Sequence, residues 1–113
     1  MSFISALFGT KFQQNDAIHK LSSEAFKAQI ENKKVQLIDV RTSREYKSGH
    51  LKGAKNIDIF SSSFNTEFNK LNKEKAVYVY CRSGSRSRQS ANKLAVMGFT
   101  KIYDLKGGII RYR

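Results

Sequence analysis

The sequence predicts an α/β fold, with a mainly parallel sheet of about five strands and helices on both faces. Two short runs of aliphatic and aromatic residues, 35–40 and 76–80, are typical of strands that are buried on both sides. Segments whose apolar residues recur at helical spacing lie before, between and after these runs. Such alternation is typical of sheets in which a helix connects each strand to the next. The chain of 113 residues suits one domain of this kind.

We expect residues 1–18 to form an N-terminal leader and residues 19–113 to form the domain. Phe3, Leu7 and Phe12 are apolar, and we expect them to pack back onto the domain; an amphipathic turn on a membrane surface is the alternative. The leader lacks the basic start, apolar stretch and cleavage site of a secretory signal. No apolar run approaches the roughly 20 residues that cross a bilayer. With a lone cysteine, the missing signal predicts a cytoplasmic protein.

The first helix is predicted to begin after Ser22, which suits an N-cap. Leu21 and Phe26 flank this cap at the spacing of a hydrophobic staple. We expect the helix to end at the polar residues 32–34, just before the strand 35–40.

A second, short helix is predicted from the capping box that Thr42 forms with Glu45. It runs through Tyr46 and ends at Gly49, because glycine suits the residue after a helix. An extended stretch is expected around residues 54–57. The apolar residues of the next predicted helix recur at helical spacing: Phe64, Phe68 and Leu71.

The strand 76–80 runs directly into Cys81 and a loop of small and basic residues. A helix is predicted over 87–97, and Gly98 suits its end. The last strand is predicted at 101–105, before two glycines and a short tail.

The charge balance predicts an anionic ligand. The net charge is +12, from 21 basic and 9 acidic residues, and such an excess favours anionic partners. No acidic residue lies between Glu74 and Asp104. We expect a small anion at this segment, with an acidic protein as a further partner. Five arginines lie in two short segments: Arg41 and Arg44, then Arg82, Arg86 and Arg88.

Several classes of site are not expected. A single cysteine excludes a disulfide within the chain and any multi-cysteine metal site, and the two histidines are far apart in the sequence. We therefore expect no metal and no cofactor. The aromatic residues fall at core positions and are not interleaved with basic ones, so nucleic-acid binding is not expected as the main function. We expect a monomer.

Cys81 stands where an α/β sheet binds ligands, beyond the carboxyl end of a strand. Residues 83–85 are small enough for the backbone to aim N–H groups inward at the positive end of the following helix. We expect a thiol held there with Arg82, Arg86 and Arg88 nearby to ionise readily, and the thiolate is the nucleophilic form. The alternative is an inert, buried thiol.

Four ordered segments carry a resemblance to the rhodanese family. They read LIDVR at 37–41, EYKSGHLKGAKNI at 45–57, VYCRSGSRS at 79–87 and MGFTKIYDLKGG at 97–108. Each motif alone is weak, but the set follows the family's order and spacing over about residues 20–112. The chain departs from the family at Tyr112, where a tryptophan is usual.

The resemblance implies a three-layer rhodanese-like domain with thiosulfate sulfurtransferase activity. In that family the loop cysteine takes sulfane sulfur from a donor such as thiosulfate, becomes a persulfide, and passes the sulfur to cyanide or a thiol. Cys81 would be this cysteine. Arg82 and Arg86 would bind the sulfonate end of the donor. The backbone amides that would stabilise the terminal sulfur belong to Arg82, Ser83, Gly84, Ser85, Arg86 and Ser87.

Three residues outside this loop are interpreted from their positions. We expect Arg41 to add to the anion pocket, or else to pair with Glu45 at the start of the second helix. Asp39 ends a strand near the site, and we expect it to orient Arg41 or the cysteine loop. His50 is expected to satisfy backbone carbonyls.

Two other functions remain open at this stage. Phosphatases of the dual-specificity type and arsenate reductases resemble this fold but carry a Cys-x5-Arg loop, whereas Arg86 makes this loop Cys-x4-Arg and Ser87 holds the next position. The shorter loop suits a sulfur atom better than a phosphoryl group, although Arg88 could turn inward. The second alternative is a non-catalytic sulfur carrier or protein-interaction module.

Overall fold

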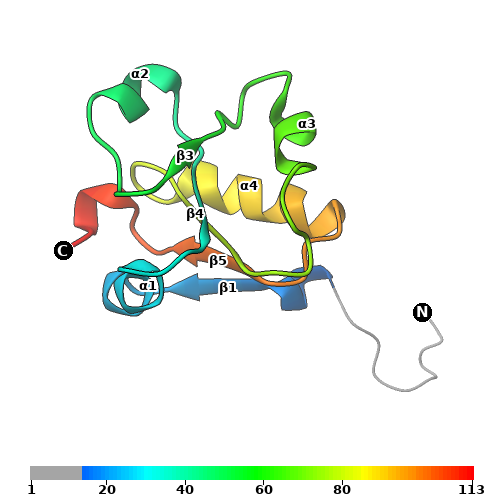
Figure 1. The fold of residues 1–113 in the computed structure, drawn as a ribbon, viewed down its shortest axis with the longest axis horizontal. Helices are drawn as coiled ribbons and strands as arrows, with labels where there is room; N and C mark the ends of the chain where they lie inside the picture. The colour runs from blue at the N-terminus through cyan, green and yellow to red at the C-terminus, as the bar shows by residue number, and fades with distance from the viewer. Residues whose placement is uncertain (1–13) are drawn as a thin grey trace.

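The computed structural model describes residues 14–113, and Figure 1 shows a sheet flanked by helices. The sheet has five strands in the order β1-β5-β4-β2-β3, and every pair is parallel. The predicted fold class is confirmed. The strands are β1 (Ile18–Leu21), β2 (Gln36–Asp39), β3 (Lys55–Asn56), β4 (Val77–Tyr80) and β5 (Ile102–Leu105). The helices are η1 (Gln14–Ala17), α1 (Ser23–Ile30), α2 (Ser43–Lys47), α3 (Phe64–Phe68), α4 (Ser85–Val96) and η2 (Ile109–Arg111).

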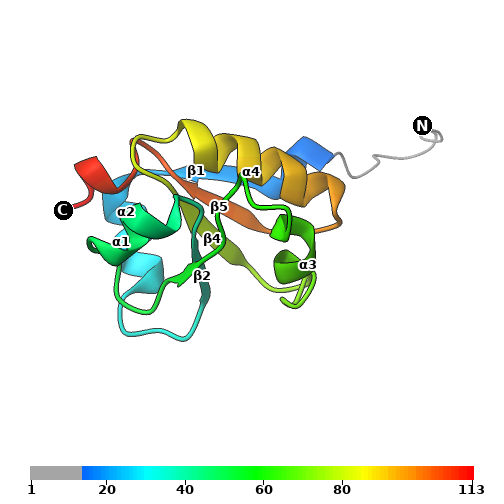
Figure 2. The same cartoon turned by 90° about the horizontal axis from the view of Figure 1, so that it is seen from above.

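The strands alternate their side chains between two apolar cores, one on each face. Figure 2 shows α4 on one side of the sheet and α1 with α2 on the other. On the α4 side, Val79 packs with Phe68 of α3 and Leu94 of α4. On the other side, Tyr80 packs with Phe26 of α1. Because β4 contributes four buried residues in a row, it places its carboxyl end, and Cys81 after it, between the two layers.

β1 was not predicted from the sequence. It pairs with β5, with Ile18 opposite Ile102, and it carries His19 and Lys20 exposed in its middle. Four residues with two exposed polar ones give no clear strand pattern, so only tertiary pairing reveals the strand. Ala17, at the end of the predicted leader, is fully buried. Phe3, Leu7 and Phe12, for which we predicted packing against the domain, lie outside the described residues.

Most predicted helix caps are present. The Ser22 hydroxyl accepts the Ala25 N–H at 3.1 Å, and the capping box of Thr42 with Glu45 is complete. α4 begins at Ser85 rather than at 87, so the first turn of the helix is part of the cysteine loop.

α3 is shorter than predicted. It ends at Phe68, and Leu71 packs on the same core from the turn that follows. Among residues 14–113, no helix is long and apolar enough to cross a membrane.

Candidate active site

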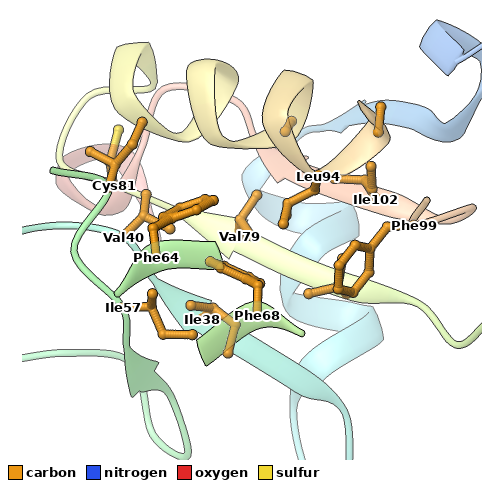
Figure 3. Close-up of a cluster of buried hydrophobic side chains, with 14 of the residues drawn as sticks. Ile38, Val40, Ile57, Phe64, Phe68, Val79, Cys81, Leu94, Phe99 and Ile102 are labelled. Atoms are coloured by element: carbon orange, nitrogen blue, oxygen red, sulfur yellow. The ribbon is translucent and has the colours of Figure 1, made fainter. Parts of the chain in front are cut away.

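Cys81 belongs to the α4-side core and directly follows β4. Its side chain is 1% exposed, yet its sulfur is not surrounded only by hydrocarbon. Figure 3 shows the sulfur pointing away from the apolar side chains around Val40 and Phe64 and toward α4. The Gly84 N–H donates to the Cys81 Sγ at 3.1 Å. The structure therefore has the inward-facing amide that the sequence predicted, and the thiol is not an all-apolar core residue.

The backbone around this sulfur is the junction of a short loop with a helix. Gly84 is the N-cap of α4 and has φ 113°, a left-handed conformation that side chains rarely adopt. The first turn of an α-helix leaves its N–H groups without intrahelical acceptors. The residues of this first turn are Ser85, Arg86 and Ser87, directly after the Gly84 N–H that contacts the sulfur. The aligned dipoles of this turn favour a negative charge on the Cys81 sulfur.

The C-terminal segment holds this loop in place. The Ile109 N–H donates to the Cys81 carbonyl at 2.9 Å, and the Ile110 N–H donates to the Arg82 carbonyl at 3.2 Å. Gly108 lies directly against the loop: a Cβ added to it would come within 2.1 Å of the Arg82 carbonyl oxygen and 2.5 Å of the Ser83 nitrogen. Only glycine fits there, which gives the Lys-Gly-Gly motif a structural reason.

Arg86 ties the start of α4 to α2. Its Nη1 and Nη2 donate to the two carboxylate oxygens of Glu45 at 2.7 and 2.9 Å. The same carboxylate accepts the Thr42 N–H at 3.1 Å. The hydrogen bond from Arg86 is the main reason that the pKa of Glu45 falls from 4.5 to about 2. Arg86 is thus held by Glu45, and this pair fixes the start of α4 against α2.

This ion pair predicts a pH-dependent loss of stability. Glu45→Gln removes the charge but keeps an oxygen for the cap, and we expect it to lower the free energy of unfolding at pH 7 by about 2 kcal/mol, as for other hydrogen bonds to charged groups. The folded pKa of Glu45 is depressed, so the wild-type advantage is present above pH 4.5 and is lost as the pH falls toward about 2. Urea unfolding at neutral and acid pH measures it.

Glu67→Gln is the matched control for this prediction. Glu67 pairs with Lys70 at 3.0 Å, but the two side chains are 42% and 65% exposed, and exposed pairs contribute little. Equal losses of stability in the two variants at pH 7 would contradict the role assigned to the Glu45 pair.

Arg41, for which we predicted a place in the anion pocket or a pair with Glu45, is bound to Asp39. It is buried, and its Nε and Nη2 donate to the Asp39 carboxylate at 2.7 to 3.0 Å. Its Nη2 also donates to the Gly49 carbonyl at 2.7 Å. The hydrogen bond to Asp39 raises the pKa of Arg41. Asp39 orients Arg41, as predicted, and the predicted alternative pair with Glu45 is wrong because Glu45 binds Arg86.

The remaining loop residues differ in exposure. Arg82, Ser83 and Ser85 are exposed, Gly84 is half-buried, and Ser87 is buried. No ion pair between described residues includes Arg82. Across residues 14–113, no group of three or more His, Cys, Asp or Glu side chains is placed to hold a metal ion.

Outside the loop, His50 Nδ1 lies 2.8 Å from the Tyr46 carbonyl oxygen, which agrees with its predicted role.

Asp104 was not predicted from the sequence as a site residue. It is a buried acid on β5 that accepts a hydrogen bond from Ser87. The one signal for it was an acidic residue inside an apolar strand.

Comparison with known proteins assigns the family. The model of the rhodanese-like domain matches residues 22–113, which include the whole cysteine loop and the Lys-Gly-Gly segment against it. The chain belongs to the rhodanese-like domain family. A rhodanese-like domain protein from Staphylococcus aureus superposes with a TM-score of 0.72 at 27% identity, covering 83% of this chain and 90% of that one.

Two relatives differ in how much of their own length is similar to this chain. The YqhL protein of Bacillus subtilis (strain 168) is 36% identical over 111 residues, which cover 98% of this chain and 85% of that protein. The tRNA uridine(34) hydroxylase of Buchnera aphidicola subsp. Baizongia pistaciae (strain Bp) is 32% identical over 107 residues, which cover 89% of this chain but 34% of the hydroxylase. The chain therefore spans about a third of the length of that enzyme.

Proposed function

We propose that this rhodanese-like domain is a sulfurtransferase that carries sulfane sulfur as a persulfide on Cys81. The observation that supports this most is the Gly84 N–H on the Cys81 Sγ, at the N-terminal end of α4. A persulfide is an anion on its outer sulfur, and helix N-termini and curled backbone amides stabilise anions. The site thus suits both the thiolate that attacks and the persulfide that results.

The reaction has two steps. The Cys81 thiolate attacks the sulfane sulfur of thiosulfate, forming a new S–S bond while the sulfur–sulfur bond of the donor breaks and sulfite leaves with the electron pair. Cyanide or a thiolate then attacks the outer sulfur of the persulfide, and Cys81 leaves as the thiolate. The amides of Gly84 and of the first turn of α4 stabilise the outer sulfur, and Arg82 binds the sulfonate end of the donor.

Access to the sulfur requires movement of the loop. Cys81 is 1% exposed, whereas Arg82, Ser83 and Ser85 above it are exposed. A donor therefore reaches the sulfur when residues 82–85 shift outward, and the anionic donor meets Arg82 first.

The positions of the arginines favour sulfur transfer over phosphoryl transfer. A Cys-x5-Arg phosphatase needs a guanidinium that wraps the phosphate, but Arg86 is held by Glu45 through both of its terminal nitrogens. Arg88 lines a pocket with Lys20, on the β1 side of the loop. Neither arginine is in place to complete a phosphate cradle.

Exposed basic residues around the loop support an anionic donor and an acidic protein partner. Lys20, Arg88 and Lys106 lie beside the loop, at the carboxyl ends of β1 and β5 and on α4. Together with Arg82 they attract anions over distances of about a Debye length, roughly 10 Å at moderate salt. An acidic surface on the protein that supplies or accepts sulfur would dock here by the same attraction.

Thiosulfate:cyanide turnover, measured beside hydrolysis of a phosphate ester, tests the proposed function. We expect thiocyanate to form and the ester to stay intact, and we expect KM for thiosulfate to rise with ionic strength because the attraction to Arg82 is screened. Ester hydrolysis without thiocyanate would reverse the assignment. A persulfide on Cys81 that no small acceptor can discharge would indicate the second candidate, a sulfur carrier that works with a protein partner.

A further inference from the structure

A chain of three side chains runs from the thiol into the sheet. The Cys81 Sγ donates to the Ser87 Oγ at 3.6 Å, and the Ser87 Oγ donates to the Asp104 Oδ1 at 2.5 Å. Cys81 directly follows β4, Ser87 lies in the first turn of α4, and Asp104 lies in β5, which is flanked by β1 and β4. Asp104 is 1% exposed, and nothing in the sulfur-transfer steps above uses it.

The number of protons fixes the direction of this chain. Ser87 has one hydroxyl proton and two acceptors for it, the Gly84 carbonyl at 3.2 Å and the Asp104 carboxylate at 2.5 Å. The shorter, charge-assisted bond goes to Asp104. An oxygen lone pair of Ser87 is then left for the thiol proton of Cys81. The chain therefore points from the sulfur to the carboxylate.

Burial disfavours the ionised form of Asp104. Within residues 14–113 it belongs to no ion pair. The charged groups that face it are Lys20 from β1 and Arg88 from α4, with Lys106 just beyond β5. Loss of water around the side chain raises the pKa of Asp104, although Ser87, Lys20 and Arg88 oppose this. The carboxyl thus accepts a proton more readily than an exposed aspartate does.

A pocket lies beside the loop and reaches Asp104. It has a volume of about 270 Å³ and is lined by Asp104, Lys20, Arg88 and residues 83–85 and 105–107. Arg86, the arginine of the cysteine loop, is held by Glu45 on the α2 side. Ser87 and Asp104 therefore connect the sulfur with this pocket.

We propose that Asp104 accepts the thiol proton of Cys81 through the Ser87 hydroxyl. The S–H bond of Cys81 breaks as Ser87 takes its proton, and Ser87 passes its own hydroxyl proton to the carboxylate. The products are a thiolate, an intact serine and a neutral carboxylic acid, with no change of oxidation state. Asp104 is thus a positioning residue that acts on Cys81 through Ser87. The proposal rests on the proposed function only for the reaction that the thiolate then carries out.

The pH dependence of thiolate absorbance in the ultraviolet tests this proposal, with Cys81→Ser as the blank. Asp104→Asn should shift thiolate formation to higher pH by about one unit or more, a tenfold loss of thiolate at a fixed pH. Ser87→Ala should shift it in the same direction, although the carboxylate remains. If Asp104 acted through its charge alone, Asp104→Asn would shift thiolate formation to lower pH instead, and that result would overturn the proposal.

Ser90→Ala is the matched control. Ser90 lies one turn further along α4, is buried, and its hydroxyl has no hydrogen-bond partner among the described residues. We expect its thiolate curve to follow the wild type. A curve shifted as far as that of Ser87→Ala would show that any small change in α4 moves the thiol, and would also overturn the proposal.

Two further readouts separate the possible failures. Infrared spectra of the wild type should show a protonated carboxyl band that is absent in Asp104→Asn and altered in Cys81→Ser. Identical bands in all three would contradict the shared proton.

Unfolding experiments give the second readout. Because the pKa of Asp104 is raised in the folded protein, its ionised form costs stability as the pH rises. Asp104→Asn should therefore unfold no more easily than the wild type at pH 7. The titration needs no sulfur donor, so it stands even if turnover with thiosulfate is not found.

Discussion

Replacing Cys81 with serine should reduce thiosulfate:cyanide turnover on the order of 10⁴-fold or more, in the range of losses when a covalent nucleophile is removed. Serine fits the same space and can accept the Gly84 N–H that now reaches the sulfur. Its hydroxyl is a much weaker nucleophile than a thiolate and forms no persulfide. Formation of thiocyanate with time measures the effect.

The fold of Cys81→Ser should remain intact. The side chain is buried beside the α4-side core, so we expect a cost of about 1 kcal/mol in the free energy of unfolding. Wild-type turnover in a folded Cys81→Ser variant would show that the reaction does not pass through Cys81.

The second large effect is expected from Gly108→Ala. A Cβ at this residue would overlap the Arg82 carbonyl and the Ser83 nitrogen, both of which are backbone atoms of the loop. Gly108 also has φ 73°, so a side chain adds backbone strain to the overlap. We expect a loss of about 3 kcal/mol in the free energy of unfolding. We also expect turnover to fall, because the loop can no longer hold its amide against the Cys81 sulfur.

Gly53→Ala separates strain from overlap. Gly53 has φ +86°, but an added Cβ would meet nothing within 4 Å. We expect it to cost about 1 kcal/mol and to leave turnover unchanged. If Gly108→Ala behaved like this control, the C-terminal segment would not be what shapes the loop.

The local features of the site could be predicted from the sequence. The capping box of Thr42 with Glu45 depends on residues three apart, and the buried strand before Cys81 is a continuous apolar run. A loop of small residues between such a strand and a helix predicts inward-facing amides, and the Gly84 N–H has this orientation. Each of these predictions rests on a few neighbouring residues.

The partners of the arginines could not be predicted in the same way. Arg86 was expected to bind a donor, and the structure shows it bound to Glu45. Glu45 is 41 residues away in the sequence, and the two residues meet because α2 and the start of α4 come together in the fold. Arg41 was expected near the anion and instead lies buried against Asp39. A guanidinium takes the best available carboxylate, and the sequence does not show which one the fold brings near.

The same reason explains why Asp104 was missed and why the contact of Gly108 with the loop was not predicted. Asp104 meets Ser87 across 17 residues of sequence, and Gly108 meets the backbone of residues 82–83. An acidic residue in an apolar strand and a pair of glycines are visible in their own segments, but neither shows which distant residue it contacts. Parallel strands bring such distant segments to one edge, and the site is assembled there.

The most direct test of a persulfide on Cys81 is the intact mass of the protein after incubation with thiosulfate and removal of the excess. We expect the wild type to gain the mass of one sulfur atom, a reductant or cyanide to remove it, and Cys81→Ser to gain none. A wild-type protein of unchanged mass, or an equal gain in Cys81→Ser, would contradict the claim that the amides around position 81 stabilise a persulfide.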